Sequence, residues 1–300
     1  MTMTQDIGTK GPLVWGDMDQ QALDAAYDQA YWAPNQQILA DRRQSLAAEA
    51  RRVIAPPVRV AYGSAEIEKI DIYKADVAKA PVAIYIHGGA WRRGRAADFA
   101  GQAEMFMRAG AHHAVLDFDN IDEHGGDLLA MAEQVRRAIA WVAKNAGSFG
   151  GDPERIYLTG HSSGAHLGGC MVTTDWSPFG LPQTFIKGAL LGSGMYDLAP
   201  VRLSKRSEYV KFTDATENEL SAMRHLDRLA CPVVLAYGTN ESPEFIRQTQ
   251  EFAAAVKAAG KPVELIVAPN YNHFEIAETL GNPYGVLGRA ALRLMELGPK

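Results

Sequence analysis

Ser162 is the residue of this 300-residue sequence whose surroundings most favour nucleophilic chemistry. It stands between Gly160 and Gly164, in the order Gly-His-Ser-Ser-Gly, directly after the apolar segment 155–159. A G-x-S-x-G pattern is typical of a sharp turn from a strand into a helix, because only glycine leaves room around such a turn. The serine then lies at the amino end of a helix, where free N–H groups favour developing negative charge. The pattern therefore predicts a serine that attacks a carbonyl carbon.

A second glycine motif could supply the groups that stabilise the resulting oxyanion. Gly88 and Gly89 follow the apolar segment 82–86, well upstream of Ser162. The backbone N–H groups of adjacent glycines can approach a ligand oxygen closely, because no side chain stands in the way. We therefore expect the N–H groups of Gly88, Gly89 and Ser163 to form an oxyanion hole.

A serine nucleophile also needs a base and an acid, which follow it in the chain in the order serine, acid, histidine. His273 comes after a strand-like segment and fits the base. Glu241 also follows such a segment and fits the acid, which would orient the histidine and stabilise its charged form. Asp197 is the alternative acid, although it also fits a turn or a helix cap.

Four residues close to these motifs are expected to line the substrate pocket. They are Trp91, Asn120, His161 and Phe274. Trp91 follows the glycine pair, and Asn120 lies in a loop that follows a strand-like segment near the same face. For Trp91, a position in the hydrophobic core is the alternative.

The segments that must position these residues alternate between strand-like and helix-like patterns. Short apolar runs predict strands at 67–73, 82–86, 113–118, 155–159, 186–191, 232–237 and 263–267. Helices are predicted at 97–108, 128–145, 163–172, 243–259 and 284–297. This alternation predicts an α/β fold with a mostly parallel central sheet and helices on both faces.

The chain divides into two parts at about residue 60. Residues 1–60 are polar, with predicted helices at 22–31 and 38–53, and form either a cap or a helical N-terminal extension packed on the body. Residues 61–300 form the predicted catalytic domain, in which no linker interrupts the alternation of strands and helices.

Composition narrows the class of partner. The net charge is −5, which argues against nucleic acid because phosphate binding needs a basic surface. Two cysteines, Cys170 and Cys231, provide neither a disulfide framework nor a zinc cluster. No signal peptide and no membrane-spanning run is evident, so a cytoplasmic location is the default expectation. We expect a small-molecule substrate, no nucleic acid and no membrane, while a homodimer stays open.

These motifs together resemble the hormone-sensitive-lipase-like branch of α/β hydrolases, and within it the kynurenine formamidase (arylformamidase) group. The similar segments are His-Gly-Gly-Ala-Trp at 87–91, Gly-His-Ser-Ser-Gly-Ala-His-Leu at 160–167, the acid loop at 237–248 and His-Phe at 273–274. The resemblance implies the α/β-hydrolase fold and hydrolysis of N-formylkynurenine or a related aryl formamide, without metal or cofactor. It also implies that Ser162 is the nucleophile, Glu241 the acid and His273 the base.

Two departures from the group leave the substrate open. The group usually has Asp where this chain has Glu241, and its loop after the fourth strand differs from residues 117–124 here. A short-chain carboxylesterase or carbamate hydrolase is therefore the alternative enzyme. A ligand-binding protein on a hydrolase scaffold is the non-enzymatic alternative, since fold alone does not imply function. The complete set of serine, histidine, carboxylate and glycine loop argues against it.

Overall fold

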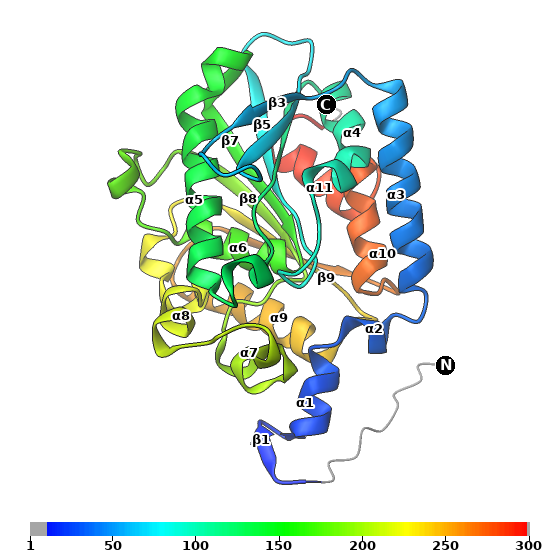
Figure 1. Cartoon of the computed structure of the whole chain (residues 1–300), viewed down its shortest axis with the longest axis vertical. Coiled ribbons are helices and arrows are strands. Elements are labelled where there is room, and N and C mark those ends of the chain that lie inside the picture. Colours follow the sequence, from blue (N-terminus) through cyan, green and yellow to red (C-terminus); the bar gives the residue numbers. More distant parts are fainter. Residues whose placement is uncertain (1–10, 299–300) are drawn as a thin grey trace.

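The computed structural model describes residues 11–298 and has an eight-stranded sheet at its centre (Figure 1). Across the sheet the strands lie in the order β10-β9-β8-β7-β5-β6-β4-β3. Their bounds are β3 (Val58–Ala61), β4 (Lys69–Tyr73), β5 (Ala80–Ile86), β6 (His112–Leu116), β7 (Gly151–His161), β8 (Ile186–Gly192), β9 (Val233–Gly238) and β10 (Val263–Ala268). The strands from β10 to β6 pair in parallel, which confirms the predicted mostly parallel sheet. The antiparallel pairing of β4 with β6 and β3 was not predicted.

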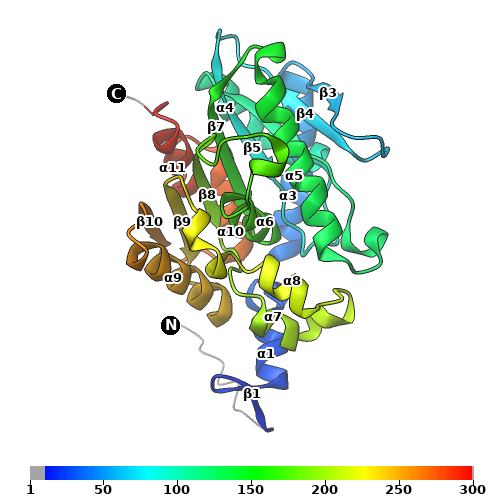
Figure 2. The ribbon, with the colours of Figure 1, turned by 90° about the vertical axis from the view of Figure 1, so that its left-hand side faces the viewer.

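Helices cover both faces of this sheet (Figure 2). One face carries α5 (Leu128–Asn145), α6 (Ser163–Val172) and α9 (Pro243–Ala258), and the other carries α3 (Gln36–Val53), α4 (Ala103–Arg108), α10 (His273–Glu278) and α11 (Val286–Leu294). Successive side chains of a strand point to opposite faces, so a strand buried on both sides is apolar throughout. In β5, Val82 and Ile84 pack in the first hydrophobic cluster, whereas Ala83 and Tyr85 pack in the second.

Short helical elements gather at one end of the molecule, at the bottom of Figures 1 and 2. They are α1 (Gln20–Ala26), α2 (Gln29–Trp32), α7 (Ala199–Leu203) and α8 (Asp214–Glu219). The amide Nε2 of Gln20 donates to the carbonyl oxygen of Leu203 at 2.8 Å, which joins α1 to α7. A β-hairpin, β1 (Leu13–Trp15) with β2 (Met18–Asp19), precedes α1. The helices between β8 and β9 were not predicted, because they are short and lack a clear apolar period.

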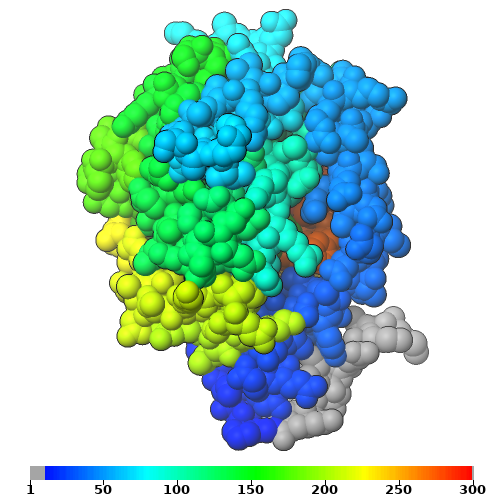
Figure 3. Space-filling view, viewed as in Figure 1, coloured from blue at the N-terminus to red at the C-terminus, as the bar shows by residue number. Residues whose placement is uncertain are grey.

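The N-terminal part reaches from this end along the side of the sheet and its helices. In Figure 3 its blue surface, which includes α3, runs upward on the right, and orange atoms of the C-terminal third lie in the hollow next to it. The predicted helices at 22–31 and 38–53 correspond to α1, α2 and α3. Within residues 11–298, no helix is long and apolar enough to cross a bilayer.

Buried histidines should make the fold sensitive to acid. Burial lowers the pKa of His87, His113, His161 and His166, to about 3 for His113 and to about 4 for His166. The unfolded chain takes up protons at these residues below about pH 6.5, whereas the folded chain takes them up only at lower pH. We therefore expect the free energy of unfolding to decrease as the pH falls from about 6.5, by up to about 1.4 kcal/mol per pH unit for each histidine.

Urea unfolding at several pH values between 7.5 and 4.5 measures this dependence. His113 offers a matched variant, because its ring stacks on Phe106 at 4.6 Å in the core and a phenylalanine would keep the stacking. In the His113→Phe variant, the free energy of unfolding should change less steeply with pH, by about 1.4 kcal/mol per pH unit. An unchanged slope in this variant would contradict the argument.

Candidate active site

The turn at Ser162 is strained in the way that the glycine pattern predicts. Strand β7 runs directly into Ser162, whose φ of 58° lies in the left-handed region that favours glycine. A Cβ at Gly164 would lie 2.0 Å from the carbonyl oxygen of Ile86, and one at Gly160 would lie 2.7 Å from that of Gly164. Both positions therefore require glycine. The strain is balanced by neighbouring contacts, since the Ser162 N–H donates to the carbonyl oxygen of Gly192 at 2.9 Å.

The structure brings Ser162, His273 and Glu241 into one chain of hydrogen bonds. Nδ1 of His273 lies 2.7 Å from Oε2 of Glu241, and Nε2 lies 2.8 Å from Oγ of Ser162. An ionised carboxylate only accepts hydrogen bonds, so Nδ1 carries the proton and donates to Glu241. Nε2 is then the acceptor for the Ser162 hydroxyl. All three side chains are buried, and this arrangement is the one that proton removal from a serine requires.

Glu241 is held on its far side by two further donors. Its Oε1 accepts from the backbone N–H of Gly238 and from the hydroxyl of Ser193, each at 2.6 Å. Ser193 is fully buried, immediately follows β8, and was missed by the sequence analysis. Ser193 could have been identified from its place directly after a central strand, at the same sheet edge as the acid loop. Asp197 is engaged elsewhere, because its Oδ1 accepts from the N–H of Ala199 at 3.1 Å.

His273 is positioned by the start of helix α10, of which it is the first residue. The preceding Asn272 is the N-cap, and its Oδ1 accepts from the N–H groups of Phe274 and Glu275, each at 3.0 Å. Glu275 completes a capping box, because its Oε2 accepts from the N–H of Asn272 at 2.8 Å. The sequence pattern places His273 only after a strand-like segment, whereas this box fixes its backbone at a helix terminus.

The glycine loop lies directly against the elbow. A Cβ at Gly88 would lie 2.6 Å from the carbonyl oxygen of His161, and one at Gly89 would lie 2.2 Å from that of Arg93. In the part of the chain that the structure describes, the N–H groups of Gly88, Gly89 and Ser163 donate no hydrogen bond to the protein. Unpaired N–H groups beside the buried Ser162 are suited to hold an oxyanion.

Two of the residues expected in the substrate pocket lie in the interior. Trp91 is 3% exposed, and its Nε1–H donates to Nδ1 of His166 at 3.3 Å. This is the core position given as its alternative. His161 is also buried, and the centroids of its ring and the His273 ring are 4.6 Å apart. Burial holds the pKa of His161 well below its usual range, so it stays neutral beside His273.

The other two expected pocket residues are half-buried. Phe274 contacts His273 edge to face, with ring centroids 5.3 Å apart, so it adjoins the base. Asn120 begins a short 3-10 helix at 121–124, and its N–H donates to Oε2 of Glu123 at 2.6 Å. Its recorded partners lie within its own loop, not in the Ser162–His273–Glu241 chain.

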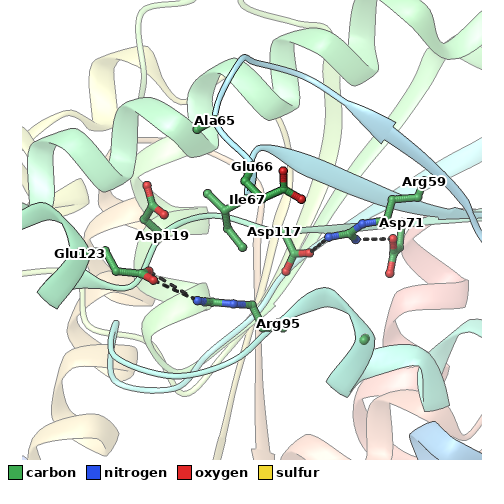
Figure 4. A pocket seen from close by; sticks show the side chains of 10 residues that line it. Arg59, Ala65, Glu66, Ile67, Asp71, Arg95, Asp117, Asp119 and Glu123 are labelled. Atoms are coloured by element: carbon green, nitrogen blue, oxygen red, sulfur yellow. Dashed lines mark hydrogen bonds and ion pairs between the residues drawn. The ribbon is translucent and has the colours of Figure 1, made fainter.

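A separate groove of about 670 Å³ is lined by charged residues, and it contains none of Ser162, His273 and Glu241 (Figure 4). Arg59 bridges Asp71 at 2.5 Å and Asp117 at 2.6 Å, and Arg95 pairs with Glu123 at 3.3 Å. These pairs join the β3–β4 edge of the sheet to the loops after β5 and β6. Both arginines that line the groove are thus paired with carboxylates that line it too, which is a structural ion-pair network.

Two family models and several known proteins are similar to this chain. Residues 70–178 match the BD-FAE family model, and residues 130–227 match the carboxylesterase family model. A kynurenine formamidase of Danio rerio is 30% identical, over 94% of this chain and 98% of its own length. A crystal structure from Silicibacter sp. tm1040 and a structure of an esterase from Thermogutta terrifontis are each 22% identical to this chain. Their TM-scores are 0.78 and 0.65, and they cover 88% and 80% of this chain, and 97% and 92% of their own.

The sheet and these structural neighbours show the fold of the α/β hydrolases. The formamidase relative and the carboxylesterase family model make the class of protein an amidase or esterase. Identity over nearly the full length of both chains then narrows the class. The chain belongs to the kynurenine formamidase family.

Proposed function

We propose that Ser162 is the nucleophile of an acyl-transfer reaction, with His273 as its base and Glu241 as the acid that orients the base. The Ser162 hydroxyl passes its proton to Nε2 of His273 while Oγ bonds to the substrate carbonyl carbon. The N–H groups of Gly88, Gly89 and Ser163 stabilise the oxyanion. The carbon–nitrogen or carbon–oxygen bond then breaks, and the leaving group takes the proton from His273. A water molecule then bonds to the acyl carbon while its proton passes to Nε2 of His273. The bond between that carbon and Oγ breaks, and Oγ takes the proton back from His273.

The observation that carries this proposal is the unbroken Glu241–His273–Ser162 chain, with heavy-atom distances of 2.7 and 2.8 Å, at a strained serine. An incidental serine in a tight turn would not need a buried histidine and carboxylate aligned behind it. Such an aligned set is the geometric requirement for activating a serine hydroxyl.

We propose that the substrate is an aryl formamide such as N-formylkynurenine. Supporting this, a relative of near-equal length is a kynurenine formamidase. A formyl group is also the smallest acyl group, so it needs little space beside a buried serine. Ser162 is only 8% exposed. The match to the carboxylesterase family model favours a short-chain ester as the second candidate.

Steady-state rates on N-formylkynurenine, p-nitrophenyl acetate and p-nitrophenyl butyrate test the substrate. We expect the highest kcat/KM for the formamide and a lower value for butyrate than for acetate. A kcat/KM for butyrate above that for the formamide would overturn the formamidase proposal in favour of the esterase. That result would leave the serine mechanism intact.

A further inference from the structure

The N-terminal segment contacts both loops that carry the acid and the base. Gln29, in α2, is buried, and its Nε2 donates to Oγ of Ser242 at 3.2 Å. Ser242 directly follows Glu241 in the chain. Asn35, just before α3, contacts the start of α10, where His273 is the first residue. These two contacts reach across more than 200 residues of sequence to positions next to the catalytic set.

Asn35 makes two hydrogen bonds with opposite polarity, and both involve the capping box of α10. Its Oδ1 accepts from Nδ2 of Asn272 at 2.8 Å, and its Nδ2 donates to Oε1 of Glu275 at 2.8 Å. Asn272 and Glu275 are the two residues whose mutual hydrogen bonds fix the backbone around His273. Asn35 therefore holds both members of the box from outside the helix. Its side chain is half-buried, which reduces competition from water.

Tyr27, at the end of α1, ties the same segment to the helix that follows the acid loop. Its hydroxyl donates to Oε2 of Glu244 at 2.7 Å and accepts from Nε2 of Gln248 at 2.7 Å. Both partners belong to α9. Its carbonyl oxygen accepts from the buried guanidinium of Arg206 at 3.0 Å. The N-terminal segment is thus anchored between α9, the acid loop and the base-bearing helix.

From this geometry we infer that Asn35 and Gln29 are positioning residues. They hold the start of α10, with His273, and the loop with Glu241 at a fixed position relative to each other. The inference rests on the proposed function. The α10 helix is short, so its start is defined by the cap and not by its own length. A displacement of about 1 Å at a catalytic group can cost about 100-fold in rate, so loss of this outer support should appear in kcat.

The test compares Asn35→Ala with Arg42→Ala as a matched control. Arg42 also joins α3 to α10, through an exposed ion pair in which its Nε donates to Oε1 of Glu278 at 3.0 Å. It lies at the far end of α10 from His273. Both variants therefore remove a contact to α10, one from the N-cap of α3 and one from α3 itself, and only Asn35 adjoins the capping box.

We expect Asn35→Ala to lower kcat for p-nitrophenyl acetate about 10-fold, with KM changed less than 2-fold. Labelling of Ser162 by a fluorophosphonate should slow by a similar factor. Arg42→Ala should stay within 2-fold of wild type in both measurements. Adding Gln29→Ala to Asn35→Ala should lower kcat further, because the acid loop then also loses its contact.

Three results would count against the inference. They are a kcat of Asn35→Ala within 2-fold of wild type, an equal loss in Arg42→Ala, or a loss that lies wholly in KM. Each of these would overturn the positioning role while wild type remains active and labelled. Wild-type protein that neither hydrolyses the ester nor reacts with the fluorophosphonate would instead overturn the proposed function, and the positioning role with it.

Discussion

Replacing Ser162 with alanine should lower kcat for any ester or formamide substrate by about 10⁴- to 10⁶-fold. The alanine removes Oγ, the atom that lies 2.8 Å from Nε2 of His273, and leaves the rest of the chain in place. No neighbouring hydroxyl can take over, since the side chain of Ser163 accepts from the N–H of Trp91 at 3.2 Å. Alanine also fits the turn better than most residues, although a φ of 58° strains any side chain.

Ser163→Ala is the matched control for this prediction. Its proposed contribution is a backbone N–H, which alanine keeps, so hydrolysis should stay within about 10-fold of wild type. Mass spectrometry after fluorophosphonate treatment should find the adduct on Ser162 in wild type and in Ser163→Ala, and no adduct in Ser162→Ala. Circular dichroism would establish that each variant is folded. Full hydrolysis by a folded Ser162→Ala would contradict the proposed mechanism.

Glu241→Gln should lower kcat by about 10⁴-fold, although it is nearly isosteric. The donors around Glu241 decide how the new amide must lie. Gly238 N–H and Ser193 O–H both point at the former Oε1, so the amide oxygen takes that place. The NH₂ group then faces Nδ1 of His273, which must become the acceptor. Nε2 would carry the proton and could no longer accept one from Ser162.

Ser193→Ala should lower kcat less than Glu241→Gln does. It removes one of the two donors to Oε1 and leaves the contact between Glu241 and His273, so we expect a loss of about 10-fold in kcat. Thermal unfolding of the same variants would separate this effect from loss of stability. A Glu241→Gln enzyme within 10-fold of wild type would show that another group orients His273. Asp197 would then be the next residue to replace.

Much of the site follows from local rules that the sequence expresses directly. The turn at Ser162 leaves no room for a Cβ at positions 160 and 164, so only a particular order of glycines can build it. The buried strands β5 and β7 need apolar residues on both faces, which makes their ends easy to recognise. The parallel order of the sheet then places the loops after its strands at one edge. From these rules alone Ser162, His273 and the glycine loop could be predicted.

Other features depended on contacts between residues far apart in the chain. Both Glu241 and Asp197 follow central strands, and only the packed structure brings Glu241 to 2.7 Å from His273. Ser193 and Asn35 carry no motif, because their partners lie 48 and up to 240 residues away. Composition could suggest a helical N-terminal segment but not what it touches. The local sequence therefore determined the turn at Ser162, the proposed nucleophile, whereas tertiary packing decided which groups surround it, since hydrogen-bond geometry depends on distances that no local pattern encodes.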